Sequence, residues 1–428
     1  MKNNNKMLLD VNDRPPVIKW ILLAVQHVFA MFGATILVPI LVNNAAGSEV
    51  LSIPVALVSS GIGTLIYIIC TKGKSPVYLG SSFAFITPII VGFAKSGKAS
   101  VFTAIMAVGI VYFIVSLIVK LAGKKWINRL LPPIVVGPMI MIIGLSLAPT
   151  AVDEIGLNLE SVPWKNIVIA LVSFLTTAVI AIRGKGFIKV IPFLIGIIAG
   201  YITSMILGVV DYSAITSAKI LDKPDFYIPF LHYNLDFKAI LTIVPIALVT
   251  MAEHVGDHKV LGTIIGKDLI EDPGLDRTLM GDGLATFAAG LIGGPANTTY
   301  GENTSVVGMT KVASVWVTGL AAVIAILFGF LGQLTAVISS IPNAVLGGVS
   351  ILLYGFISVN GLKILIQNQV DFNKTKNVIV AATMLVLGLG GAAISLATKN
   401  ISVTISGMSL AAIIGILINI LMPDEKGE

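Results

Sequence analysis

Long apolar runs alternate with short polar segments along almost the whole chain. Since a helix needs about 20 mostly apolar residues to cross a bilayer, each run predicts one membrane span. Fourteen spans are predicted, seven on each side of a more polar stretch at 211–237, which is expected to be an external loop. Their ranges are 18–42, 51–70, 77–93, 101–121, 130–148, 166–182, 187–210, 239–261, 279–293, 297–311, 313–333, 334–357, 376–394 and 402–422. The chain is therefore predicted to be an all-α polytopic membrane protein.

The composition agrees with a chain that faces lipid. Apolar residues make up 56% of the 428 residues and charged residues only 12%. A soluble domain carries roughly a quarter charged residues, so half that amount leaves too little polar surface to enclose a soluble core. The net charge of +6 is not gathered into a basic run with interleaved aromatic residues, which argues against nucleic acid as a partner. The one cysteine, Cys70, excludes a disulfide within the chain.

Lysine and arginine residues are concentrated in alternate loops, and this predicts the orientation of the spans. If the N-terminus is placed in the cytoplasm, the inner segments hold 21 of the 28 positive residues and the outer segments hold seven. The outer ones are Lys95, Lys98, Lys165, Lys219, Lys223, Lys238 and Lys399. The asymmetry predicts an even number of spans in the cell membrane, with both termini cytoplasmic.

The two halves of the chain share a layout. The motif QHV at 26–28 in the first span matches EHV at 253–255 in the eighth. About 50 residues later each half has its weakest span, at 77–93 and at 297–311. Because seven is odd, two homologous halves of seven spans enter the bilayer from opposite faces. The sequence thus predicts a 7+7 inverted repeat, a common plan among secondary transporters.

The third and tenth spans contain glycine and polar residues that interrupt their apolar character. Residues 80–84 and 297–300 are predicted to be short extended pieces near the middle of the bilayer, where irregular backbone occurs only inside protein or beside a cavity. Each leads into a half-helix, starting near Phe83 and near Gly301. The free N–H groups at these starts are candidate donors to the carbonyl oxygens of a substrate. The alternative is a pair of re-entrant loops with a packing role only.

Two carboxylates lie inside the predicted spans, Glu253 in the eighth and Glu302 in the tenth. An ionised carboxylate in mid-membrane costs at least ~2.5–3.5 kcal/mol, so both residues are candidate functional groups. Asp257 lies one helical turn after Glu253 on the same face, and two nearby carboxylates oppose each other's ionisation, which suits proton coupling. The alternative is a buried acid that pairs with a cation or caps a half-helix. Tyr300 and Tyr354 either orient the acids or are ordinary packing residues.

The histidines of these spans leave several interpretations open. His254 and His258 are placed to relay protons. Their spacing also suits a metal site, although the HExxH order and a third cluster of ligands are missing; otherwise His258 is a cytoplasmic residue near the end of its span. His27 in the first span is expected to be structural, with a hydrogen bond to the serines of the third span, such as Ser82. Asp282 in the ninth span is expected to cap or pair at the membrane edge.

Five motifs in these regions resemble one family of transporters. They read QHVFAMFGATILVP at 26–39, YLGSSFAFITP at 78–88, AEHVGDH at 252–258, NTTYGENTSV at 297–306 and GGVSILLYG at 347–355. They are similar to the nucleobase–cation symporter-2 family, also called nucleobase–ascorbate transporters, and within it to the bacterial uracil permeases. The resemblance covers essentially the whole chain. Glu302 before Asn303 resembles the pyrimidine branch, since purine branches typically have Gln there.

This resemblance implies a fold of fourteen spans in two domains. A core domain is expected from spans 1–4 at 17–121 and spans 8–11 at 239–333. A gate domain is expected from spans 5–7 at 130–210 and spans 12–14 at 334–422. Substrate would lie between the short strands of spans 3 and 10, and the core would move against the gate in alternating access. Members of the family are often dimers, so a homodimer is expected.

The resemblance also implies roles for single residues in proton-coupled uracil import. It gives no cofactor besides the proton as coupling ion, no metal and no enzymatic activity. The residues it assigns to substrate binding are Glu253, Glu302, Phe83, Gly301 and Tyr300. Those it assigns to proton coupling are Asp257, Glu253 and Tyr354, and those it assigns to structural support are His27, Ser82 and Asn303.

Two positions depart from the family pattern. Some uracil permeases have His at the place of Asp257, so the proton carrier stays open between Asp257 and Glu253. The signature usually has Gly at the place of Ser305. Transport of another nucleobase, such as xanthine or thymine, therefore stays open, as does transport of an anion by a protein of the same plan. A membrane enzyme is a third class, for which no nucleophile–base pair stands out.

Overall fold

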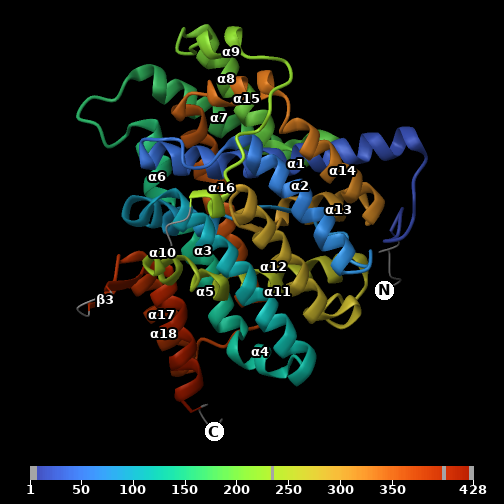
Figure 1. Cartoon of the computed structure of the whole chain (residues 1–428), viewed down its shortest axis with the longest axis vertical. Coiled ribbons are helices and arrows are strands. Elements are labelled where there is room, and N and C mark those ends of the chain that lie inside the picture. The colour runs from blue at the N-terminus through green and yellow to red at the C-terminus, as the bar shows by residue number, and fades with distance from the viewer. Residues whose placement is uncertain (1–6, 233–235, 398–401, 424–428) are drawn as a thin grey trace.

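The structure is a computed structural model that describes residues 7–232, 236–397 and 402–423. Most of these residues lie in helices (Figure 1). The helices are α1 (Val17–Ala46), α2 (Ile53–Cys70), α3 (Ile86–Ala122), α4 (Lys125–Leu130), α5 (Pro133–Ser146), α6 (Ala148–Ile155), α7 (Trp164–Arg183), α8 (Pro192–Ile206), α9 (Ser213–Ser217), α10 (Phe237–Ile243), α11 (Ile246–Ile265), α12 (Leu275–Ile292), α13 (Gly301–Thr310), α14 (Val315–Phe328), α15 (Gly332–Ser339), α16 (Asn343–Gln367), α17 (Thr375–Leu389) and α18 (Gly407–Leu421). The strands are β1 (Leu79–Ser81), β2 (Asn297–Thr299), β3 (Ala393–Ala397) and β4 (Ser402–Ser406).

Seven helical stretches of the described residues are long and apolar enough to cross a membrane. Their outward side chains are apolar too: in α7, Leu171, Leu175 and Val179 are all about half exposed. A helix that is apolar on all sides suits a lipid environment. The seven stretches are Val17–Ala46, Ile53–Cys70, Phe83–Ala122, Pro133–Ile155, Trp164–Arg183, Phe237–Ile265 and Asn343–Gln367, and the shorter apolar helices are α8, α14, α17 and α18.

One predicted boundary is wrong, and another is present as a kink. Between the spans expected at 77–93 and 101–121, α3 breaks at Gly97, whose φ of 76° and ψ of 174° are not helical. Glycine adopts a positive φ without steric cost, so two helices meet at this kink. The span expected at 334–357 is instead divided between α15 and α16 at residues 340–342, and α16 continues to Gln367 because apolar residues recur to its end.

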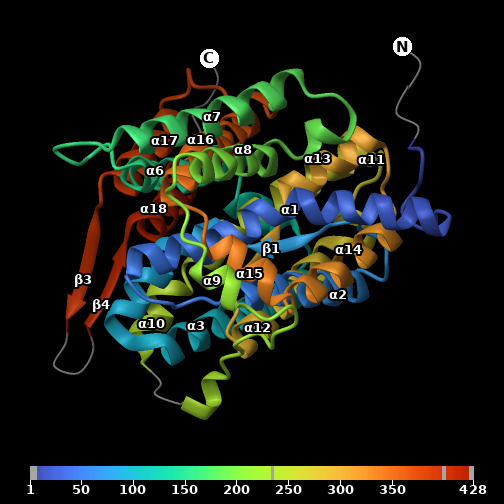
Figure 2. The ribbon, with the colours of Figure 1, turned by 90° about the horizontal axis from the view of Figure 1, so that it is seen from above.

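An antiparallel hairpin, β3–β4, lies where a loop was expected between the last two predicted spans. The range 402–422 therefore begins as a strand and becomes helical only at Gly407. The sequence SVTIS of β4 is rich in β-branched residues, which favour extended backbone over helix. Figures 1 and 2 show the hairpin at the edge of the molecule, away from the central strands.

The helices form two groups that are both assembled from distant parts of the sequence (Figure 2). In one group α12 packs against α2 and α3, and α14 packs against α1 and α2. In the other, α16 packs against α5, α6, α7 and α8, and α17 packs against α18 and α5. Helices from both halves of the chain therefore contribute to each group.

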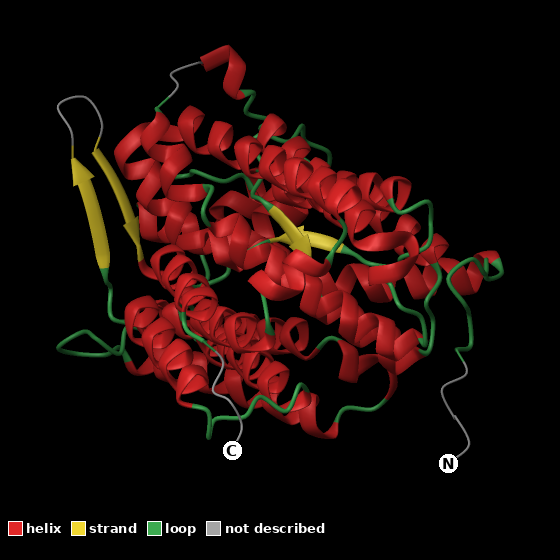
Figure 3. Ribbon diagram, turned by 90° about the horizontal axis from the view of Figure 1, so that it is seen from below, coloured by secondary structure: helices red, strands yellow, loops and turns green. Residues whose placement is uncertain are grey.

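Two short strands cross at the centre of the molecule, surrounded by helices (Figure 3). β1 and β2 are antiparallel, with Gly80 opposite Thr298. The ladder is extended on both sides, because Ser82 N donates to Ala296 O and Tyr300 N donates to Tyr78 O. All residues of both strands are buried. The pairing satisfies backbone groups that have no helical partner, and it joins the two halves of the chain.

The segment before α1 is fixed on the connection between α13 and α14. Leu8 N and Leu9 N donate to Lys311 O, and Ala313 N donates to Leu9 O. Lys267 Nζ lies 2.7 Å from Asp10 Oδ1, and this hydrogen bond holds the pKa of the Asp10 carboxyl below its ordinary value. These contacts hold the end of α13 that is farther from β2.

Gly80 tests how tightly the central strands are packed. A Cβ atom at this position would overlap the ring of Tyr300, so Gly80→Ala is expected to lower the free energy of unfolding by about 1–3 kcal/mol through overpacking. The measurement is the midpoint of thermal unfolding in detergent. Gly355→Ala in α16 is the control, since a Cβ there meets nothing within 4 Å. Equal midpoints for the two variants would contradict the packing described here.

Candidate functional site

A cavity of about 740 Å³ lies against β2 and the half-helix α13. Its inner part is lined by Phe83, Thr298, Thr299 and Gly301, and it extends along the second half of α16. It ends at a mouth formed by Lys189, Lys363 and Gln367, whose side chains are exposed. The cavity therefore connects the central strands with one end of the molecule.

Three carboxylates line this cavity. Glu253 and Asp257 come from α11, where their spacing of four residues puts them on one face, as the sequence predicts. Glu302 comes from the first turn of α13. All three are partly buried, whereas His254 and Asn303 beside them are buried. The fold thus brings together acids that lie 49 residues apart in the sequence.

The two predicted half-helix starts also line the cavity. Phe83 begins a short 3₁₀ turn, Phe83–Phe85, that leads into α3, and Gly301 is the first residue of α13. The first N–H groups of a helix have no partner within it, so both starts offer donors to a ligand. The cavity therefore combines carboxylate acceptors with backbone donors.

The two tyrosines are placed differently from the acids. The Tyr300 hydroxyl donates to Ser81 O at 2.9 Å and accepts from Thr35 Oγ1 at 3.1 Å. This hydroxyl fastens the start of α13 to β1, and Tyr300 also lines the cavity. Tyr354 is buried and lies behind Phe83, with the ring centroids 6.3 Å apart. It does not line the cavity itself, but its ring contacts Phe83, which does.

His27 has a different partner from the one predicted. Asn303 Nδ2 lies 3.1 Å from His27 Nδ1 and donates to His27 O at 3.0 Å. The hydroxyls of Ser81 and Ser82 are buried without a hydrogen-bond partner among the described residues. The expected bond from His27 to the serines is therefore wrong, because His27 contacts Asn303 of α13 instead. His27 and Asn303 instead connect α1 with α13.

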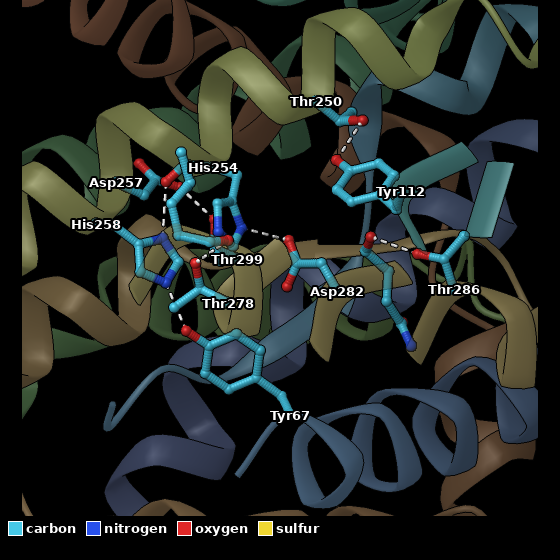
Figure 4. A network of polar contacts seen from close by, with 12 residues as sticks. Tyr67, Tyr112, Thr250, His254, Asp257, His258, Thr278, Asp282, Thr286 and Thr299 are labelled. Atoms are coloured by element: carbon cyan, nitrogen blue, oxygen red, sulfur yellow. Dashed lines mark hydrogen bonds and ion pairs between the residues drawn. The ribbon is translucent and has the colours of Figure 1, made fainter. Parts of the chain in front are cut away.

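The other face of α11 carries a buried polar network (Figure 4). His254 Nδ1 lies 2.7 Å from Asp282 Oδ2, and both side chains are fully buried. His258 Nδ1 contacts His254 O at 2.7 Å, and its Nε2 lies 2.5 Å from the Tyr67 hydroxyl. The expectation that Asp282 lies at the membrane edge is wrong, and so is the reading of His258 as a cytoplasmic residue. Sequence reasoning missed Tyr67, because a tyrosine near the end of an apolar span gives no distinct signal.

The metal alternative finds no geometric support in the part of the chain that the structure describes. No group of three or more His, Cys, Asp and Glu residues there is arranged to hold a metal ion. Three of the four ring nitrogens of His254 and His258 lie against protein groups instead: Asp282, Tyr67 and a backbone carbonyl. The network connects α2, α11 and α12. It therefore holds α11, the helix that carries Glu253 and Asp257, in place from the side away from the cavity.

Comparisons with known proteins decide the family. A family model described as "Permease family" matches residues 18–396, which is most of the chain. The chain belongs to this family. The permease is 46% identical over 425 residues to the uracil permease of Bacillus caldolyticus, covering 98% of this chain and 95% of that one. It is 41% identical over 429 residues to the uracil permease of Escherichia coli (strain K12), and the match covers 97% of this chain and 96% of that one.

These relatives confirm the family resemblance drawn from the motifs. They also show that the permease is a transporter and not an enzyme, and its many apolar helices are those of a multi-pass membrane protein. The uracil permease of Bacillus subtilis (strain 168) is 45% identical and covers 100% of this chain, with 98% of its own length covered. The match thus includes every residue of the cavity described above.

Solved structures with the same fold come from more distant transporters. The transmembrane domain of a cyanobacterium bicarbonate transporter, BicA, has a TM-score of 0.60 at 14% identity, covering 95% of this chain and 98% of that one. The murine anion transporter Slc26a9 in the inward-facing state has a TM-score of 0.69 at 12% identity. The match covers 96% of this chain and 69% of that one. At such low identity these similarities show the fold alone.

The buried pair His254–Asp282 predicts a non-additive effect on stability. His254→Leu or Asp282→Leu alone leaves one polar group buried without its partner, which typically costs about 3–5 kcal/mol. The double variant is expected to recover most of this loss, because two apolar side chains replace the pair. Thermal unfolding of the three variants in detergent measures the effect. A double variant that loses the sum of the two single losses would contradict it.

Proposed function

We propose that this permease imports uracil together with protons. The observation that carries the proposal is the single cavity lined by Glu253, Asp257 and Glu302 and by the helix starts at Phe83 and Gly301. The uracil permeases that align with the whole chain support the same substrate. No cofactor is proposed besides the proton as coupling ion.

The chemistry of the cavity matches the edges of a uracil ring. Uracil presents two N–H donors and two carbonyl acceptors, and it carries no charge. The carboxylates of Glu253 and Glu302 are suited to accept from the N–H groups, and the N–H groups of Phe83 and Gly301 are suited to donate to the carbonyls. A polar site of this kind rejects an analogue that leaves one of its groups unpaired. Competition with unlabelled xanthine and thymine would separate uracil from other nucleobases.

The coupled proton is proposed to bind within the pair Asp257 and Glu253. Both line the cavity one turn apart, so a charge on one opposes a charge on the other. Uracil bound beside Glu253 changes the surroundings of the pair. Binding of a proton and binding of uracil thereby become linked. Tyr354 is proposed to act on this pair only through the ring of Phe83.

The fold suits alternating access between two domains. We propose fourteen spans in a 7+7 inverted repeat, with β1 and β2 interrupting spans 3 and 10 and both termini in the cytoplasm. The core domain comprises 17–121 and 239–333, and the gate domain comprises 130–210 and 334–422. The cavity lies between them, with α11 and α13 on the core side and α16 on the gate side. A homodimer is proposed as the working assembly.

Glu253→Gln tests the substrate site. Glutamine replaces the charged acceptor by a neutral carbonyl oxygen and adds an NH2 donor that finds no acceptor in a uracil N–H group, and loss of one charged hydrogen bond corresponds to about 10- to 100-fold weaker binding. Uptake of labelled uracil is therefore expected to fall to background, while the protein still reaches the membrane in normal amounts. Glu160→Gln is the control, since Glu160 is exposed in the loop between α6 and α7. Wild-type uptake by the Glu253→Gln variant would refute the proposed role.

Uptake of labelled uracil into proteoliposomes tests the proton coupling. An inward proton gradient is expected to drive accumulation of uracil, and a protonophore is expected to abolish it. Binding of uracil with no dependence on the gradient would contradict proton symport but keep uracil as the substrate. No binding of uracil at all would refute the proposed substrate.

A further inference from the structure

Asp257 is tied to the central strand β2 by a single hydrogen bond. Thr299 Oγ1, at the end of β2, donates to Asp257 Oδ2 at 2.7 Å (Figure 4). Thr299 is almost fully buried, while Asp257 is partly open to the cavity. Hydrogen bonds donated to a carboxylate are short and strong, and they favour its ionised form. The bond therefore affects both the position of Asp257 and its affinity for a proton.

Thr299 also belongs to the strand that leads into the substrate half-helix. Tyr300, Gly301 and Glu302 follow Thr299 directly in the chain. Thr299 is paired with Leu79 across the β1–β2 ladder. A ligand that shifts Glu302 or the start of α13 therefore acts on the residue that holds Asp257.

We propose that Thr299 is a positioning residue that links occupancy of the substrate site to the protonation of Asp257. This inference rests on the proposed proton-coupled function. In the empty site the hydroxyl holds the carboxylate in its charged form. When the substrate displaces the end of β2, the bond lengthens and Asp257 takes up a proton more readily. The link needs no contact between Asp257 and the substrate.

Other charged groups act on Asp257 as well. The carboxyl groups of Glu253 on α11 and Glu302 on α13 line the same cavity, and that of Asp282 on α12 is buried against His254 of α11. Lys189 and Lys363 at the mouth of the cavity carry the opposite charge. None of these groups is altered by a substitution at Thr299, so their contributions stay constant in a comparison of Thr299 variants.

The test compares Thr299→Val with Thr299→Ser in the full-length protein. Valine keeps the shape of threonine but removes the donor, whereas serine keeps the donor. Binding of labelled uracil is measured as a function of pH, and wild-type binding is expected to fall as the pH rises and the site loses its proton. In Thr299→Val this fall is expected about one pH unit or more higher, since one hydrogen bond to a charged group corresponds to that shift. Thr299→Ser is expected to keep the wild-type profile.

The outcomes separate this inference from the function on which it rests. A wild-type profile in Thr299→Val would overturn the inference, and so would an equal shift in Thr299→Ser, because packing alone would then explain it. Wild-type protein that binds no uracil would instead overturn the proposed function. In an Asp257→Asn background, Thr299→Val is expected to cause no further shift; a full shift there would also overturn the inference.

The end of the molecule opposite the cavity mouth is held by a polar contact of its own. The cavity follows α16 from Leu353 to Gln367, whereas Asn343 is the first residue of this helix. At about 1.5 Å per residue, the two ends of α16 are roughly 36 Å apart. At the Asn343 end, Asn44 Nδ2 donates to Asn343 Oδ1 at 3.0 Å and to Glu154 Oε1 at 3.3 Å.

This contact joins the two groups of helices. Asn44 lies near the end of α1, whereas Glu154 belongs to α6 and Asn343 to α16. Glu154 is 9% exposed, and its Oε2 has no hydrogen-bond partner among the described residues. A buried carboxylate with an unpaired oxygen is costly, and opening this end would return that oxygen to water. The free energy gained from the two hydrogen bonds is thus partly offset by the buried, unpaired Glu154 oxygen, so little free energy is needed to break the contact.

We infer that Asn44, Asn343 and Glu154 form a latch that closes this end of the permease while the cavity is open at the other end. In a transporter that alternates between two open ends, the latch has to break before the opposite end opens. Its strength therefore sets the share of molecules in the conformation described here.

Cysteine labelling tests the latch without any substrate. In a Cys70→Ser background, Asn360→Cys places one thiol in the cavity, which Asn360 lines. Loss of the latch in Asn44→Ala is expected to slow labelling of this thiol by at most about 3- to 10-fold, since one or two hydrogen bonds change the equilibrium by this factor and the share of open molecules falls by no more than that. Asn158→Ala is the matched control, because Asn158 bonds to Asp153 within the same group of helices. Unchanged labelling in Asn44→Ala, or an equal change in Asn158→Ala, would overturn the latch.

Discussion

The pairing of β1 with β2 is the interaction on which the rest of the site depends. Two extended segments meet in the interior of a largely apolar molecule, where unpaired backbone groups are expensive. Each strand satisfies the other, and Tyr300 adds a hydrogen bond from its side chain to the carbonyl of Ser81. Gly80 leaves room for that ring. Without the pair, neither half-helix would have a fixed starting point, because each begins directly after its strand.

The half-helix starts and the acids then follow from the geometry of the pair. Because β1 and β2 are antiparallel, the chain leaves them in opposite directions, toward α3 and toward α13. Both helix starts nevertheless line the same cavity. α11 lies beside β2 and contributes Glu253 and Asp257, and Thr299 fixes this helix to the strand. The site is therefore a joint product of strand pairing and helix packing.

Behind the site, a second polar layer holds the helices in register. The pair His254–Asp282 connects α11 with α12, His258–Tyr67 connects α11 with α2, and His27–Asn303 connects α1 with α13. Polar contacts of this kind have direction, unlike apolar packing, so they define the rotation of each helix about its axis. A rotation of α11 would move Glu253 and Asp257 out of the cavity. The helices α5, α7 and α16 approach one another closely at glycines, since a Cβ at Gly144 would overlap Ser358 and one at Gly348 would overlap Ala170.

The sequence by itself determined the helical membrane class, the two weak regions near 80 and 297, and the acids Glu253, Asp257 and Glu302 as candidates. Each of these depends on local chemistry: apolar length, residues unsuited to a continuous helix, and a charge in an apolar run. The motifs further indicated the family. Only the tertiary structure decided which groups meet. Asn303 and not Ser82 bonds to His27, Asp282 is buried against His254, Tyr300 faces Ser81, and Asn44 reaches Glu154 and Asn343. Such contacts join residues up to about 300 positions apart, and their choice depends on the rotation and depth of whole helices, which no local pattern of residues encodes.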